Sequence, residues 1–173
     1  MSFITFGEIL MRLSTPHHQT FEQAQAFDIH YGGAEMNVAI GLSGLGIDTA
    51  MVTALPNNDI GDNIIQHLRR YNVNADKVKS ASGRLGIYFT ESGYAQRANR
   101  LIYDRQMSVF SQLNPDEYEI ESILKAHEWF HITGITAALN DALFEYLKKA
   151  VKIAKTLGLF VSCDLNFRDA LWD

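Results

Sequence analysis

Cysteine, proline and clustered positive charge are scarce in this sequence. Cys163 is the single cysteine among 173 residues, so one chain cannot form a disulfide framework. The formal net charge is −5, and lysine and arginine form no block along the chain. This charge pattern disfavours nucleic acid and anionic membranes as partners. Because Cys163 lies in an apolar run, we predict that it is a buried packing residue and not a nucleophile.

We also expect neither a membrane-spanning stretch nor a secretory leader in this sequence. No apolar run approaches the roughly 20 residues that a membrane-spanning helix needs. The first residues, Met-Ser-Phe-Ile-Thr-Phe, enter a strand pattern directly and have no basic segment before them. We therefore expect a soluble, cytoplasmic protein with no membrane partner.

Predicted strands alternate with predicted helices over most of the chain. Gly46 and Gly158 end two of the helices, as glycine commonly does. This alternation predicts an α/β fold built on a parallel sheet. The predicted strands are 3–7, 49–54, 129–133 and 159–165, and the predicted helices are 34–45, 62–71, 115–126 and 141–157.

Two intervals, about 10–31 and 84–105, interrupt the alternation. Both read as extended structure, and the second contains two strand patterns, 85–90 and 100–105, joined by a hairpin loop. A small β-sheet lid beside the α/β core explains both interruptions.

The clearest binding element is Tyr-Gly-Gly-Ala-Glu-Met-Asn at 31–37. Glycines before a helix let the backbone approach a ligand closely, and the first turn offers free N–H groups. Asn37 follows within that turn and can hydrogen-bond a polar ligand. The element favours a small molecule rich in hydroxyls or negative charge, although two glycines before a helix are also typical of a tight turn.

Two patterns that would indicate other chemistry lack the required context. His-Glu-Trp-Phe-His at 127–131 matches the zinc-protease pattern H-E-x-x-H, which works only on a helix. Residues 129–133 favour a strand, which would separate the two histidines by roughly 13 Å. The glycine-rich run 41–46 lies late in a helix, and no P-loop occurs. We predict no metal site in this chain.

Several motifs, in order along the whole chain, resemble the ribokinase-like (PfkB) carbohydrate kinase family. Within the family, the chain most resembles the N-terminal part of 2-keto-3-deoxygluconate kinases. Glu35 stands where the family usually has proline, a change familiar in that branch. The motifs are Gly-Gly-Ala-Glu-Met-Asn-Val-Ala at 32–39, Leu-Gly at 45–46, Asn-Asp-Ile-Gly at 58–61, Tyr-Asp-Arg at 103–105, His-Ile-Thr-Gly-Ile-Thr at 131–136, Asp-Leu-Asn-Phe-Arg at 164–168 and Leu-Trp at 171–172.

The resemblance implies a fold and a set of site residues. The fold is a Rossmann-like three-layer α/β sandwich with a β lid, of which residues 1–173 are an incomplete part. The lid of this family commonly pairs between subunits, which implies a homodimer. Arg168 would lie close to the transferred phosphate. The implied substrate-binding residues are Gly33, Asn37, Tyr88, Tyr103, Arg105 and Arg168.

The resemblance also implies an activity. The complete protein would transfer the γ-phosphate of ATP, with Mg²⁺, to the terminal hydroxyl of 2-keto-3-deoxygluconate. Two arginines suit a substrate with a carboxylate, because the guanidinium fork matches it. The family's Gly-Ala-Gly-Asp element, with the catalytic Asp, is absent from the chain. We expect the 173 residues to be the sugar-binding half and inactive alone.

Other interpretations stay open from the sequence. A fructokinase or another neutral-sugar kinase fits most of the same motifs. A non-catalytic module for sugar binding or dimerisation fits the core and lid without any chemistry. Arg105 and Arg168 could instead pair with Asp104, Asp164 or Asp169 in ordinary salt bridges, and Tyr88 could serve only to pack the lid.

Overall fold

The main sheet has five parallel strands in the order β5-β4-β1-β8-β9. The computed structural model describes residues 1–169 and 171, so Trp172 of the motif at 171–172 lies outside the described residues. The parallel pairing confirms the α/β prediction. The strands are β1 (Ser2–Phe6), β4 (Asp48–Pro56), β5 (Val73–Ala81), β8 (Trp129–Thr133) and β9 (Phe160–Asp164).

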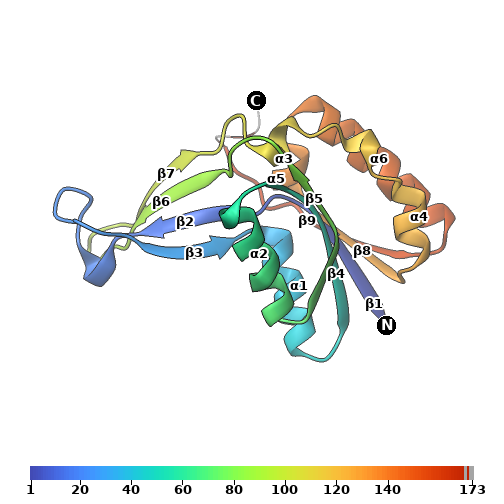
Figure 1. Ribbon diagram of the computed structural model, residues 1–173, viewed down its shortest axis with the longest axis horizontal. Helices are drawn as coiled ribbons and strands as arrows, with labels where there is room; N and C mark the ends of the chain where they lie inside the picture. The colour runs from blue at the N-terminus through green and yellow to red at the C-terminus, as the bar shows by residue number, and fades with distance from the viewer. Residues whose placement is uncertain (170, 172–173) are drawn as a thin grey trace.

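Helices cover both faces of this sheet, which gives the three predicted layers (Figure 1). α1 (Ala34–Gly44) and α2 (Asp59–Arg70) lie on one face. α4 (Ile120–Lys125) and α6 (Asp141–Thr156) lie on the other, together with the short α3 (Val109–Gln112). Each face has its own cluster of buried apolar side chains, and burial of that area is the main favourable term for folding. None of the described helices is long and apolar enough to cross a membrane.

A second sheet projects from the main body and forms the left part of Figure 1. Its order is β3-β2-β6-β7, from β2 (Leu10–Ser14), β3 (Asp28–Gly32), β6 (Ile87–Glu91) and β7 (Arg100–Asp104). β2 and β6 pair in parallel, and the other two pairs are antiparallel. We call this sheet the lid; its strands come from the two intervals that interrupt the α/β alternation.

Two predicted helices differ from the structure, one by a break in its middle and one at its start. The single helix over 115–126 is wrong: a 3-10 turn, η2 (Pro115–Glu117), is separated from α4 by extended backbone at Tyr118. This break lets the Tyr118 ring enter the core, where its hydroxyl donates to the Thr53 carbonyl at 2.5 Å. α2 begins before residue 62 because the Asn58 side chain caps its first turn, accepting from two backbone N–H groups.

One strand and the environment of the cysteine also depart from the predictions. β5 was not among the predicted strands. Its side chains have no simple two-residue alternation of buried and exposed positions, because its pairing with β4 shifts register between Ala50 and Val52. The prediction that Cys163 is buried is wrong, since its side chain is exposed. β9, which carries it, is an edge strand of the described sheet. An apolar run thus does not guarantee burial on both faces.

The main sheet and the lid meet where two chain segments cross. Residues 7–9 lead from β1 into β2, and Gly33 leads from β3 into α1. A side chain at Gly33 would overlap the Glu8 carbonyl oxygen. The φ angle of Gly33 is 179°, which any residue adopts, so close contact and not backbone conformation requires glycine here.

We expect Gly33→Ala to destabilise the protein by roughly 1–3 kcal/mol, because the added methyl overlaps backbone that cannot rotate away. Gly41→Ala is the matched control, since Gly41 lies within α1 with open space around it. That change should stabilise by up to about 1 kcal/mol through helix propensity. Urea unfolding of the three proteins measures both effects, and similar stability changes for the two variants would contradict the crossing argument.

Candidate functional site

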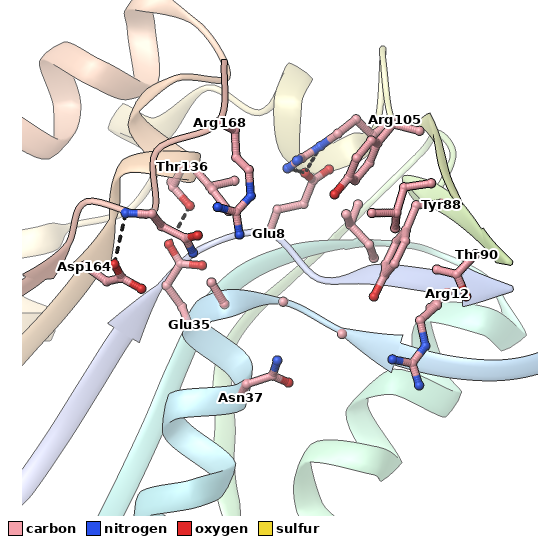
Figure 2. A pocket seen from close by; sticks show the side chains of 18 residues that line it. Glu8, Arg12, Glu35, Asn37, Tyr88, Thr90, Arg105, Thr136, Asp164 and Arg168 are labelled. Atoms are coloured by element: carbon pink, nitrogen blue, oxygen red, sulfur yellow. Dashed lines mark hydrogen bonds and ion pairs between the residues drawn. The ribbon is translucent and has the colours of Figure 1, made fainter. Parts of the chain in front are cut away.

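A cavity of about 530 Å³ lies between the lid, the start of α1 and the segment after β9 (Figure 2). Its lining comes from segments that are far apart in the sequence, and it contains every residue that the sequence predicted for the site. The structure therefore brings these six residues to one place, although their roles stay predictions. They are Gly33, Asn37, Tyr88, Tyr103, Arg105 and Arg168.

The two glycines at 32–33 have protein atoms as their nearest neighbours. Besides the contact of Gly33 with Glu8, a side chain at Gly32 would lie 3.1 Å from the Tyr88 hydroxyl. The glycines thus let β3 and α1 approach the lid and the β1–β2 connection. The backbone at 32–34 then forms one wall of the cavity, with Asn37 at its end.

Tyr88 and Tyr103 form an aromatic pair on the lid. They face each other across β6 and β7, with ring centroids 5.7 Å apart and planes inclined by 26°. Burial raises the pKa of the Tyr88 hydroxyl, while the nearby Arg12 cation opposes the rise. The Tyr88 hydroxyl therefore stays protonated near neutral pH, and both tyrosines offer hydroxyls that can donate and accept.

Arg105 is held by a residue that the sequence analysis did not single out. Its Nε donates to the Glu8 Oε2 at 3.0 Å, and its Nη2 donates to the same oxygen. The Ser108 hydroxyl donates to the other carboxylate oxygen. Both partners of the ion pair are largely buried, which fixes the direction of the guanidinium. The alternative pairing with Asp104 is wrong, because Asp104 pairs with Arg84 at 2.6 Å.

Arg168 enters the cavity from the segment that follows β9. Its Nη1 donates to the Phe167 carbonyl at 2.9 Å, and no ion pair is recorded for it among residues 1–169 and 171. Asp164 and Asn166 line the same side, where the Asn166 N–H donates to Asp164 Oδ1 at 2.9 Å. The described contacts thus leave most of the Arg168 guanidinium donors available.

Glu35 is a buried acid on the cavity wall, in the first turn of α1. Its Oε1 accepts from the Thr133 N–H at 3.1 Å, the Thr133 hydroxyl at 2.8 Å and the Thr136 hydroxyl at 2.7 Å. Burial raises the pKa of this carboxyl, and the two hydroxyl bonds oppose the rise. Glu35 thereby ties α1 to α5 (Gly134–Ala137) and to the end of β8. Its partners Thr133 and Thr136 are 98 and 101 positions away, so local spacing in the sequence could not reveal these bonds.

The H-E-x-x-H pattern at 127–131 does not form a zinc-protease helix. Residues 129–133 form β8, as predicted. The His131 Nδ1 lies 2.8 Å from the Ser162 hydroxyl, and the His127 Nδ1 lies 2.9 Å from the Ile123 carbonyl. Within the described part of the chain, no three His, Cys, Asp or Glu side chains are grouped as a metal site.

We expect Glu35→Gln to change how stability depends on pH. In the folded protein the pKa of Glu35 lies above the reference value of 4.5, so folding takes up a proton between these two pH values. The stability that this proton uptake provides is complete below pH 4.5 and is lost as the pH rises through the folded pKa. Glutamine can accept the same three bonds through its oxygen and does not titrate. The variant should therefore gain stability relative to the wild type as pH rises above 4.5.

Glu35→Ala is the matched loss of the acceptor. It leaves the buried Thr133 N–H unpaired, and the expected destabilisation is roughly 1–3 kcal/mol at every pH. Urea unfolding of the three proteins between acidic and neutral pH measures both effects. A stability difference between the wild type and Glu35→Gln that does not vary with pH would contradict the assignment.

Comparison with known proteins identifies the family. The chain matches the family described as "pfkB family carbohydrate kinase" over residues 2–173. The crystal structure of 2-dehydro-3-deoxygluconokinase from Thermotoga maritima is similar, with 45% identity and a TM-score of 0.96, over 99% of this chain and 53% of that one. 2-Dehydro-3-deoxygalactonokinase of Haloferax volcanii is 34% identical over 98% of this chain and 53% of its own length.

A relative named for a neutral sugar is similar as well. Fructokinase-1 of Zea mays is 31% identical over 98% of this chain and 52% of its own length. The chain thus spans about half the length of the curated relatives it matches. Since the family match covers nearly every residue and the fold agrees with it throughout, the chain belongs to the pfkB family of carbohydrate kinases.

Proposed function

We propose that this chain is the sugar-binding part of an ATP-dependent kinase that phosphorylates 2-keto-3-deoxygluconate on its terminal hydroxyl. The observation that carries the proposal is the presence of Arg105 and Arg168 in one cavity with the Tyr88–Tyr103 pair. Two relatives with names of keto-deoxy sugar-acid kinases support the same substrate class.

The chemistry of the cavity matches that of a sugar acid. The carboxylate of the substrate needs a cationic partner, and guanidinium groups supply it with fixed geometry. The hydroxyls of the substrate need groups that both donate and accept, which the tyrosine hydroxyls and the Asn37 amide provide. A neutral hexose has no carboxylate for a guanidinium group to bind.

Phosphoryl transfer depends mainly on positioning and on stabilising negative charge. In the proposal, Arg168 stands on the side of the transferred phosphate and stabilises it electrostatically. Closure of the lid excludes water and protects ATP from hydrolysis. ATP is the phosphate donor. The proposal assigns the base that takes the hydroxyl proton, and the ligands of Mg²⁺, to no residue of this chain.

We also propose that two copies associate through the lid. One face of the lid carries an apolar row across its four strands, Ile29, Leu13, Phe89 and Ile102, which are paired directly in register. Ile29 and Ile102 are 62% and 49% exposed. Ile29→Lys should therefore shift the protein toward monomer in sedimentation, whereas Leu45→Lys, at an exposed site outside the lid, should not. An unchanged sedimentation coefficient for Ile29→Lys would contradict this association.

The first test is turnover of 2-keto-3-deoxygluconate, fructose, ribose and gluconate by the complete gene product with ATP. We expect phosphorylation of the keto acid with the highest kcat/KM, measured by coupled ADP release. A higher kcat/KM for fructose or ribose would replace the proposed substrate with a neutral sugar and leave the fold and family unchanged.

Arginine variants test the site itself. Arg168→Met and Arg105→Met should each raise the KM for the keto acid, or lower its kcat, by roughly 10- to 100-fold, as expected for a lost charge-assisted hydrogen bond. Arg70→Met, at an exposed position at the end of α2, is the control and should leave both constants unchanged. Equal losses on fructose and on the keto acid for Arg105→Met would contradict a role of Arg105 in binding the acid, whereas Arg168, on the side of the transferred phosphate, should lower the turnover of both substrates.

A further inference from the structure

Arg12 is a third cation on the cavity wall, and neither the sequence motifs nor the proposed function uses it. It lies on β2 and lines the cavity together with Leu10, the residue two positions earlier. Figure 2 shows Arg12 at the lid side of the pocket, across from Arg168. The two arginines therefore bracket the space that a ligand would occupy.

The register of the lid places Arg12 in line with the tyrosine pair. Arg12 is paired with His30 on β3 and with Tyr88 on β6, and Tyr88 is paired with Tyr103 on β7. Side chains that are directly opposite on neighbouring strands project to the same face of a sheet. One row of four side chains thus crosses the lid, and three of its members line the cavity.

The guanidinium of Arg12 is incompletely paired. Its Nε is buried without a hydrogen-bond partner, and the ion pairs found within residues 1–169 and 171 do not include it. Buried donors in folded proteins are normally hydrogen-bonded, so Arg12 has unused hydrogen-bonding capacity. Because its Nε is covered by protein, a ligand in the cavity would have to bind the terminal nitrogens of the side chain. The charge is also uncompensated, unlike that of Arg105, which Glu8 offsets.

Among the residues that the structure describes, no carboxylate forms an ion pair with Arg12. Glu8 binds Arg105 and Ser108. Glu35 and Asp164 lie on the opposite side of the pocket from Arg12 (Figure 2). Asp28, on β3, is paired with Ser14 one step along the lid face. Arg12 thus keeps a charge that an anionic ligand in the cavity can offset.

We propose that Arg12 binds the carboxylate of the sugar acid and sets the preference of the site for acids over neutral sugars. This inference rests on the proposed function, in which Arg168 stands at the end of the substrate that receives the phosphate. The carboxylate is at the other end of the six-carbon chain, and Arg12 is the uncompensated cation at the other end of the cavity. The planar guanidinium can bind both carboxylate oxygens.

The test compares Arg12→Met and Arg12→Lys with the wild type in the complete gene product. For each protein, kcat and KM are measured with 2-keto-3-deoxygluconate and with fructose, the latter as an inhibitor where its turnover is too slow. Arg12→Met should raise the KM for the keto acid roughly 10-fold or more and change the constant for fructose by less than about threefold. Arg12→Lys keeps the positive charge but lacks the planar guanidinium, so its KM for the keto acid should lie between those of the wild type and Arg12→Met.

Arg100→Met is the matched control, since Arg100 is an exposed lid arginine on β7 outside the cavity lining. Arg100→Met should leave the ratio of the KM for the keto acid to the constant for fructose unchanged. Thermal unfolding of each variant checks that the lid arginines are not needed for folding. If Arg12→Met does not fold, the ratio measured for Arg12→Lys decides.

The outcomes separate the two proposals. If the wild type prefers the keto acid but the Arg12 variants bind the acid and fructose more weakly by the same factor, the role of Arg12 is overturned and the proposed function stands. A wild type that prefers fructose overturns both. A selective loss of the acid, absent in Arg100→Met, supports the assignment of the carboxylate to Arg12.

Discussion

The site depends on Glu8, which connects the two sheets through both its backbone and its side chain. Its carbonyl lies so close to Gly33 that only glycine fits, which fixes the approach of α1. Its carboxylate binds Arg105 and Ser108, which fixes the chain that leaves β7. One buried acid therefore sets the position of the helix start and of the lid relative to each other. A buried ion pair with all its oxygens bonded is costly to break from one side.

The cavity distributes its positive charge unequally, and this matters for what it can bind. The charge of Arg105 is offset within the protein, so it acts mainly as an oriented set of donors. The described ion pairs leave the guanidinium groups of Arg12 and Arg168 uncompensated, on opposite walls. A ligand with negative charge developing at both ends, a carboxylate at one and a phosphate at the other, matches this arrangement better than a neutral sugar.

Local patterns in the sequence predicted much of the fold. The alternation of β8 and α6 with their neighbours, and the glycines after α1 and α6, were sufficient because those signals depend on near neighbours. β5 was missed because a register shift breaks its alternation, and the break at Tyr118 depends on a core 65 residues away in sequence. Arg12 and Glu8 were missed because their neighbours are distant in sequence. Arg12 is paired with Tyr88 across β2 and β6, and Glu8 binds Arg105, 97 positions away.

The parallel pairing of β2 with β6 has a consequence for how the protein folds. The hydrogen bond between Thr90 and Ser14 joins residues 76 positions apart, and α1, β4, α2 and β5 all lie between them. Closing so long a loop loses chain entropy unless the intervening core has already formed. The lid is therefore expected to assemble last and to open first, so amide hydrogens on β2 and β6 should exchange through local openings while those on β1 and β4 require global unfolding.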